Sequence, residues 1–367
     1  FGDPDETVPK TNKSYREIFD EMLIEKNEFE FKINLKYVDY YTTRNKWVTR
    51  KFKEIFGEKR EYSEPLTNHH KNIAAALQSK LENFVIKQLK AAKKKYGYDN
   101  LCLSGGVALN CSMNGKIEQS GLFDQIYIQP ASADDGCAIG ACYLANNKNN
   151  NEQFYSKSNY NSYLGSRYTD EEIEIELKNS KINYSKSSNI FKETAKYLEN
   201  GNIIGWFQGP AEFGPRALGN RSILCKPYPA EMKDHLNNQV KFRENFRPFA
   251  PAVLSEFQNE FFEINQNSFH MLIASKVKED KVNVIPAVVH VDRSARVQTV
   301  NKSSNEKFYN LLEEFKNLTN IPVLLNTSFN VKGQPIVNNP RDAIETFKKT
   351  KIDVLSIGNF ILKKEKL

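Results

Sequence analysis

The sequence predicts an α/β protein with two domains. Its 367 residues are enough for two separate hydrophobic cores. Short apolar segments typical of strands alternate with segments of helical spacing in both halves, and this alternation favours the α/β class. The composition turns polar between Asn183 and Asn189. We therefore expect one domain over residues 1–185 and a second over residues 186–367.

Composition and charge disfavour several classes of protein. Apolar residues make up 40% of the chain and charged residues 26%, as in soluble globular proteins, and no apolar run is long enough to span a membrane. The net charge of +7 is spread out and does not indicate a nucleic-acid-binding protein. The first residues lack the basic flank and apolar core of a signal peptide. The cysteines form no CxxC pair, which disfavours a disulfide framework or zinc site and favours a reducing cytoplasm.

The most informative stretch is FQGPAEFGPRALGNRS at residues 207–222, with KFRENFRPFAP at residues 241–251. Glycines let backbone N–H groups approach a ligand closely, and clustered Arg and Lys side chains supply charged donors for phosphate or carboxylate. The pattern favours an anion-binding site. A solvated basic surface is the alternative. The cationic residues of the two segments are Arg216, Arg221, Lys241, Arg243 and Arg247.

A glycine turn in the first half has the pattern of a phosphate cradle. After a helix that begins at Asn68, a short strand over Leu101–Leu103 runs into Ser104-Gly105-Gly106, and another helix is expected from Val107. Free N–H groups at such a turn and the dipole of the following helix together favour negative charge. A purely structural turn is the alternative.

Two adjacent carboxylates follow the next predicted strand, at residues 125–129. Asp134 and Asp135 precede a glycine and a small-residue helix expected over Cys137–Ala145. Carboxylates at the end of a strand, beside a glycine-rich turn, commonly hold a metal or a ribose or orient a nucleophile. The alternative is that one of them only caps the helix.

The second half continues the alternation of helices and strands. Helices are expected at residues 190–199, 231–238, 306–318 and 340–348, and strands at residues 203–207, 286–300, 321–326 and 354–361.

Six motifs, read together, resemble the nodulation- and antibiotic-type O-carbamoyltransferases. They fall in order between Asn68 and the C-terminus: SGGVALN, PASADDGCAIGA, FGPRALGNRSI, KFRENFRPFAPAV, HVDRSARVQTV and NTSFNVKGQPIV. The resemblance implies an α/β chain of two modules. The first is the C-terminal lobe of an actin/Hsp70-type (ASKHA) ATPase fold related to the tRNA threonylcarbamoyl-transferase. The second is a YrdC-like α/β domain.

The resemblance also implies a reaction. Carbamoyl phosphate and ATP would form carbamoyl-adenylate in the YrdC-like domain, and the other module would transfer the carbamoyl group to a hydroxyl of a small-molecule acceptor. The implied cofactors are ATP, Mg²⁺ with the ATP, and a divalent metal, often Fe²⁺, at the transfer site. A homodimer is expected by analogy only.

By matching motif, the resemblance assigns roles to residues of this sequence. Carbamoyl phosphate and nucleotide phosphates would contact Arg216, Asn220, Arg221, Lys241, Arg243, Arg247, Asn326, Ser328 and Asn330. Gly105, Gly106 and Asn110 resemble the nucleotide loop of the ATPase-type module, and Asp134 resembles its metal ligand. The residues expected to take part in catalysis are Lys241, Arg247 and His290.

Three histidines allow more than one interpretation. His290 could move a proton or contact the phosphate, since a neutral imidazole works near neutral pH, or it could be a structural hydrogen-bonding residue. His69 and His70 open a predicted helix. Adjacent residues of a helix point in different directions, which disfavours them as a pair of metal ligands.

The sequence departs from the family pattern at its start, which lacks the longer N-terminal half and the histidine pair that family members usually carry. Three explanations stay open: a fragment, a partner chain that supplies the missing lobe, or lost transfer activity. A tRNA threonylcarbamoyl-type activation enzyme and a non-catalytic nucleotide-binding subunit are the alternative functions.

Overall fold

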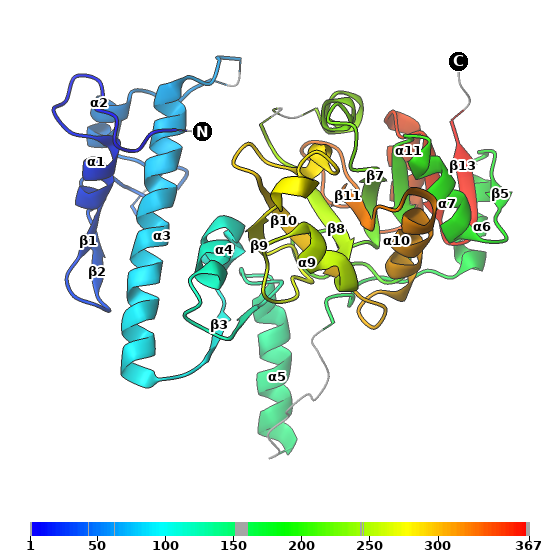
Figure 1. The fold of residues 1–367 in the computed structure, drawn as a ribbon, viewed down its shortest axis with the longest axis horizontal. Helices are drawn as coiled ribbons and strands as arrows, with labels where there is room; N and C mark the ends of the chain where they lie inside the picture. Colours follow the sequence, from blue (N-terminus) through cyan, green and yellow to red (C-terminus); the bar gives the residue numbers. More distant parts are fainter. Residues whose placement is uncertain are drawn as a thin grey trace. The chain divides into compact units, whose positions relative to one another are not determined.

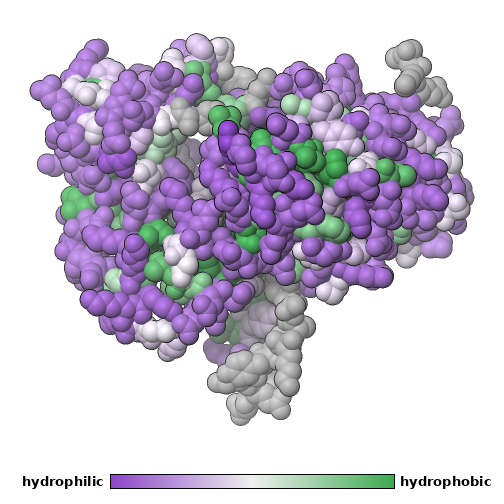
Figure 2. Space-filling model, viewed as in Figure 1, coloured by the Kyte–Doolittle hydropathy of each residue, from purple (hydrophilic) through white to green (hydrophobic). Residues whose placement is uncertain are grey.

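The structure, a computed structural model, describes residues 2–42, 44–61, 63–150, 161–242, 244 and 246–364. The chain forms two compact units (Figure 1). Unit 1 contains residues 1–100 and 120–124, and unit 2 contains residues 101–119 and 125–367. In the described part of the chain, no helix has the length and apolar character needed to cross a bilayer. Hydrophilic residues cover most of the face shown in Figure 2.

Unit 1 is built around a long helix, α3 (Asn68–Tyr96), which contacts α1 (Tyr15–Met22). Ser14 caps α1 in a capping box with Glu17. The unit also contains α2 (Arg50–Phe56) and the antiparallel pair β1 (Leu23–Glu25) and β2 (Phe31–Ile33). Its core consists of Val8, Tyr15, Ile18, Phe19, Met22, Tyr37, Phe56 and Ala76.

Unit 2 is organised by a 9-stranded sheet with the order β5-β13-β12-β6-β7-β11-β8-β10-β9. The pairs β6–β12 and β8–β10 are parallel, and the other neighbours are antiparallel. The strands are β5 (Ser185–Lys186), β6 (Ile204–Phe207), β7 (Arg221–Cys225), β8 (Ala250–Leu254), β9 (Ile273–Lys276), β10 (Ser294–Val300), β11 (Val323–Ser328), β12 (Val354–Ile357) and β13 (Phe360–Lys363).

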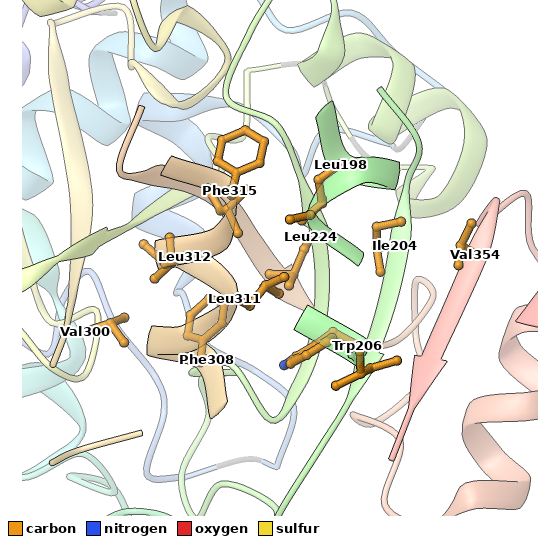
Figure 3. Packing of buried hydrophobic residues seen from close by; sticks show 14 of the residues in the cluster. Leu198, Ile204, Trp206, Leu224, Val300, Phe308, Leu311, Leu312, Phe315 and Val354 are labelled. Atoms are coloured by element: carbon orange, nitrogen blue, oxygen red, sulfur yellow. The ribbon is translucent and has the colours of Figure 1, made fainter. Parts of the chain in front are cut away.

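Helices α7 (Ile190–Glu199) and α10 (Glu306–Thr319) pack against each other and contact strands of this sheet. Figure 3 shows Trp206 of β6 among the buried side chains that join them. The labelled members of this core are Leu198, Ile204, Trp206, Leu224, Val300, Phe308, Leu311, Leu312, Phe315 and Val354. Helices α6 (Asp170–Asn179) and α11 (Pro340–Lys349) also contact each other.

A smaller layer of unit 2 comes from the first half of the sequence. It contains β3 (Asn100–Leu103), α4 (Cys111–Gln119), β4 (Gln125–Ile128) and α5 (Gly136–Asn150). Helix α4 lies directly on β9, and a Cβ atom at Gly115 would come within 2.0 Å of the Ala274 carbonyl oxygen. Asn114 Nδ2 donates hydrogen bonds to the carbonyl oxygens of Ala108 and Leu272, both at 2.8 Å. The close approach of α4 to β9 requires glycine at position 115, because any side chain there would separate the helix from the strand.

The predicted α/β class is confirmed, and most predicted elements are present with small shifts of their ends. Three differ. The strand expected at 354–361 is a hairpin, because Gly358, with φ of +54°, and Asn359 turn the chain between β12 and β13. The segment 286–300 forms a strand only from Ser294, after a short 3₁₀ turn. The helix expected from Val107 starts with a 3₁₀ turn over Gly106–Leu109, and α4 follows.

The expected boundary at residue 186 does not coincide with the end of a compact unit. It passes through β5, which pairs with β13. Residues well before it are already attached to the connection between β6 and β7, because Gly165 N–H donates to the Ala211 carbonyl and the Ser166 carbonyl accepts from Ala211 N–H, each at 2.9 Å. The chain from about residue 161 therefore belongs with the C-terminal half.

Candidate functional site

The candidate site is built on the connection between β6 and β7, residues 208–220, called here the Arg216 loop. A buried carboxylate holds its backbone. Glu212 Oε1 accepts hydrogen bonds from the backbone N–H groups of Leu218 at 2.7 Å, Asn220 at 2.8 Å and Arg221 at 3.3 Å. Burial raises the pKa of Glu212, and the N–H donors oppose that rise. The carboxylate therefore fixes the chain on the C-terminal side of Arg216.

The carbonyl groups of the same loop are held as well. Trp206 Nε1 donates to the Gly219 carbonyl oxygen at 2.8 Å. The Leu218 carbonyl oxygen accepts from Gln298 Nε2 at 2.8 Å and from the Tyr163 hydroxyl at 2.9 Å. Gly219 has φ of +103°, and a Cβ atom there would lie 2.2 Å from Phe308 Cδ1. The loop is thus preorganised by groups on several different strands and helices.

Arg216 lies on this fixed loop and has no hydrogen bond or ion pair to another described residue. Its Nε atom is shielded from solvent and lacks an acceptor. A shielded guanidinium N–H that meets no acceptor is unfavourable, because it has lost its hydration without replacement. An anionic ligand would supply the missing acceptor.

Arg221 and Asn220 have structural partners in place of a ligand. The Arg221 guanidinium is buried and lies 3.6 Å from the centre of the Phe207 ring. Its Nη atoms donate to the carbonyl oxygens of Gln208, Gly209, Asn220 and Ser166. Burial lowers the pKa of Arg221 to about 10. The Asn220 side chain bridges the Pro210 carbonyl and Asn305. Both residues hold the loop together.

Lys241, Ser328 and Asn330, which the sequence predicts to share a site, are brought together. Lys241 ends a π-helical turn over Asn237–Lys241 and is 5% exposed. Its Nζ atom donates to the Asn330 carbonyl oxygen at 3.0 Å and to Asn330 Oδ1 at 2.9 Å, and it also contacts the Ser328 carbonyl and hydroxyl oxygens. The Ser328 hydroxyl donates to Asn330 Oδ1 at 2.7 Å. The ammonium group is therefore held at the end of β11.

Asn326 connects the two clusters. It is two residues before Ser328 on β11, so both side chains lie on the same face of the sheet. Asn326 Nδ2 donates to Gln298 Oε1 at 2.8 Å and reaches the Ala217 carbonyl oxygen, next to Arg216, at 3.4 Å. Lys241 and Arg216 thus lie toward the same end of β11.

The other predicted residues of this site are more loosely held or are not described. Arg243 lies outside the described residues. The Arg247 side chain is 55% exposed, and its Nε atom lies 2.9 Å from Glu244 Oε2. An exposed pair of this kind is weak, so the Arg247 side chain is available to a ligand at little cost.

His290 lies in the turn that precedes β10. Its Nδ1 atom contacts the Ser294 hydroxyl at 3.3 Å, and its Nε2 atom is buried without a partner among the described residues. Burial lowers the pKa of His290 to about 4; nearby Asp292 opposes this, and Arg296 and Lys233 add to it. The ring is neutral near neutral pH, as a proton acceptor must be.

The glycine turn of the first half stays open. Gly105 has φ of +94°, its N–H donates to the Ser132 carbonyl at 2.8 Å, and a Cβ atom at Gly105 or Gly106 would contact nothing within 4 Å. Asn110 Oδ1 accepts from Met113 N–H at 3.0 Å and so caps α4. The Ser132 contact places the predicted nucleotide loop close to the predicted metal ligand, Asp134.

The described residues do not by themselves form the metal site that the resemblance implies. Asp134 and Asp135 are both exposed, and no group of three or more His, Cys, Asp and Glu side chains that could hold a metal occurs in the described ranges. His69 Nε2 donates to the Phe56 carbonyl oxygen at 2.8 Å, and His69 Nδ1 is hydrogen-bonded to the Tyr15 hydroxyl. His70 caps α3 through Thr67. The two histidines have structural partners in unit 1.

The residues that position the site have little signal in the sequence. Glu212 lies within the Arg216 loop, and Gln298, Tyr163 and Trp206 bond to it from outside. None of the four lies in a recognisable pattern of catalytic spacing. Glu212 had one usable signal, because a single carboxylate stands inside a run of glycines and prolines near several cations. The role of Gln298 depends on strand register and has no local signal.

Comparison with known proteins identifies the family. The carbamoyltransferase N-terminus family model matches residues 6–143, and the carbamoyltransferase C-terminus model matches residues 195–364. This chain belongs to the carbamoyltransferase family. The candidate site described above lies within the part matched by the second model.

Three relatives show how much of a carbamoyltransferase family member the chain represents. The uncharacterized protein sll1178 of Synechocystis is 41% identical, over 95% of this chain and 61% of the relative. Nodulation protein NolO of Bradyrhizobium diazoefficiens is 39% identical, over 99% of this chain and 64% of its own length. Nodulation protein NolNO of Sinorhizobium fredii is 41% identical, over 84% and 46%. The chain spans less than two thirds of the length of each.

Proposed function

We propose that this chain is the adenylate-forming part of an ATP-dependent O-carbamoyltransferase. One carbamoyl phosphate, one ATP and one water would give carbamoyl-adenylate, pyrophosphate and inorganic phosphate. An acceptor hydroxyl would then attack the carbamoyl carbon, and AMP would leave as the proton of the hydroxyl is transferred to a base. Membership of the carbamoyltransferase family supports the carbamoyl group as the group that is transferred.

The observation that carries the proposal is the state of Arg216. A backbone held by Glu212 and Gln298 presents a guanidinium group that has no partner among the described residues. It lies toward the same end of β11 as the ammonium group of Lys241. Carbamoyl phosphate and ATP are both polyanions, and preorganised cations stabilise the charge that develops in phosphoryl transfer. We assign the phosphate groups to Arg216 and Lys241, with the exposed side chain of Arg247 as a further ligand. Asn326, Ser328 and Asn330 would orient the reacting groups.

The same proposal gives a role to the open glycine turn. The free space over Gly105 and Gly106 fits a second nucleotide loop, in an ASKHA-type module, with the adjacent Asp134 as one ligand of a metal. The C-terminal half would then be the YrdC-like module. No step of the chemistry is assigned to the metal, since the described residues lack the other ligands. The neutral ring of His290 is the candidate proton acceptor.

Pyrophosphate release by the purified chain tests the proposal, with ATP in the presence or absence of carbamoyl phosphate. Release that requires carbamoyl phosphate is expected. Release that requires bicarbonate and threonine instead would indicate a threonylcarbamoyl-type activation enzyme. A folded chain that binds ATP without releasing pyrophosphate under either condition would contradict adenylate formation by this chain.

A further inference from the structure

A chain of amide hydrogen bonds runs from the Arg216 loop to β11. The Leu218 carbonyl oxygen accepts from Gln298 Nε2, and Gln298 Oε1 accepts from Asn326 Nδ2, each at 2.8 Å. Gln298 and Asn326 are each 1% exposed. We call these three groups the amide relay. It joins two strands, β10 and β11, that are separated in the sheet by β8.

The relay fixes which atom each amide turns toward its neighbour. A backbone carbonyl can only accept, so Gln298 must present its NH₂ group to Leu218. The Gln298 side-chain oxygen then faces Asn326, so Asn326 must donate to it from its own NH₂ group. The Ala217 carbonyl, 3.4 Å from the same Nδ2 atom, favours this orientation too. Asn326 Oδ1 is therefore fixed as the free end of the relay, and it is an acceptor.

The free end of the relay is an acceptor that meets no donor in the described part of the chain. Asn326 Oδ1 is shielded from solvent and has no hydrogen-bond partner there. Asn326 also lies close to the residues that carry or hold the two cations: its Nδ2 atom reaches the carbonyl of Ala217, next to Arg216, and Ser328, two residues further along β11, contacts Lys241. The site thus combines positive charge, which requires an anion, with one fixed acceptor, which requires an N–H or O–H group on the same ligand.

We infer that Asn326 Oδ1 accepts a hydrogen bond from the NH₂ group of carbamoyl phosphate and that Gln298 positions it for this contact. The inference rests on the proposed function and adds the means by which the substrate is selected. Carbamoyl phosphate carries an amide donor next to a phosphate. Acetyl phosphate has a methyl group in the same position, which cannot donate and would leave the acceptor unpaired.

Binding of three ligands to the wild-type chain tests the selection without any substitution. Calorimetric titrations with fresh carbamoyl phosphate, acetyl phosphate and inorganic phosphate compare the same anion with and without the amide. We expect carbamoyl phosphate to bind at least about tenfold more tightly than acetyl phosphate. Equal affinity for the two would overturn the inference. A chain that binds inorganic phosphate but does not bind carbamoyl phosphate would instead contradict the proposed function.

Gln298→Met tests the positioning role, with Gln266→Met as the matched control. Gln266 also bonds to backbone groups, the N–H and carbonyl of Ile126, but it does not touch the Arg216 loop. Gln298→Met should weaken carbamoyl phosphate binding about tenfold or more and leave inorganic phosphate binding within about twofold. The control should change neither. A parallel loss of both ligands in Gln298→Met, or no loss at all, would overturn the positioning role.

Asn326→Ser provides the second variant if Gln298→Met does not fold, as judged by thermal unfolding. It shortens the side chain and removes Oδ1 without adding bulk. The preference for carbamoyl phosphate over acetyl phosphate should disappear in this variant. An unchanged preference for carbamoyl phosphate would show that a group other than Asn326 binds its NH₂ group.

Discussion

Two glycine-bearing turns of this molecule have similar sequence signals and different physical states. The Arg216 loop is held by side chains from β6, β10 and the segment before α6, and its glycine at position 219 faces Phe308 directly. The turn at Gly105 and Gly106 has one backbone tether, to Ser132, and open space above it. Side chains that fix a loop before any ligand binds indicate a preorganised site. Open space above a turn indicates only that a ligand would fit there.

The same contrast appears between two arginines of this region. Arg216 and Arg221 are five positions apart and chemically identical, but the Nη atoms of Arg221 donate to buried carbonyl oxygens, whereas Arg216 has no hydrogen bond to another described residue. Substitution of each should therefore affect a different property.

Arg216→Met should have the largest effect on activity. Removal of a preorganised cation that stabilises the negative charge developing on a phosphate commonly lowers the rate about 100-fold or more. The expected result is a fall of at least that size in carbamoyl-phosphate-dependent pyrophosphate release, with an unchanged unfolding midpoint. Arg341→Met, which removes an exposed arginine paired with Glu176, should keep wild-type rates. A normal rate in Arg216→Met would remove Arg216 from the site.

Arg221→Met should have the largest effect on stability. It leaves buried carbonyl oxygens without donors, which should lower the free energy of unfolding by about 3 kcal/mol. Denaturant unfolding monitored by tryptophan fluorescence measures it, since Trp206 is buried in the folded protein. If the variant were as stable as wild type but inactive, Arg221 would be a ligand after all and the contrast with Arg216 would fail.

Gly219→Ala and Gly105→Ala compare the two turns directly. Both residues have positive φ, so alanine is strained at each, at about 1 kcal/mol. Only at Gly219 does the new Cβ atom also collide with Phe308, so its loss should reach about 2 kcal/mol or more. The difference between the two unfolding free energies is the informative quantity. Equal losses of unfolding free energy would mean that the Arg216 loop accommodates the added methyl group as easily as the open turn does.

Acid should weaken the structure through two partly buried histidines. Burial lowers the pKa of His270 and His290 to about 4 from 6.5, so between these values the unfolded chain binds more protons than the folded one. The free energy of unfolding should fall as the pH drops from about 6.5 to about 4. The slope should be smaller in a His270→Gln, His290→Gln double variant. Identical slopes would show that neither histidine is neutral in the folded protein. Glu212, with its raised pKa, contributes in the opposite direction and cancels from the difference.

Gly106→Ala should have the smallest effect on stability, because its φ is not positive and its Cβ atom would meet nothing within 4 Å. If the turn holds a nucleotide, the methyl group should weaken ATP binding in equilibrium titrations while the unfolding midpoint stays constant. Unchanged ATP affinity would favour a purely structural turn.

The sequence predicted what depends on local pattern. Buried strands such as β11 and amphipathic helices such as α10 were found because apolar periodicity reports directly on burial. The hairpin at Gly358 was missed, although the Gly-Asn pair that makes it is a known turn signal. The motif could not separate Arg216 from Arg221, because the difference lies in where carbonyl groups of distant segments fall. Gln298 became visible only when the sheet register placed it near Leu218.

The ends of the Arg216 loop carry a further consequence. Phe207 and Arg221 are paired across antiparallel strands, so the loop is a long hairpin connection whose closure is already complete before any ligand arrives. Little backbone entropy then remains to be lost on binding. We expect anion capture at this site to be limited by diffusion and electrostatic attraction, with rates that fall as salt screens the positive charge and that show little delay from loop closure.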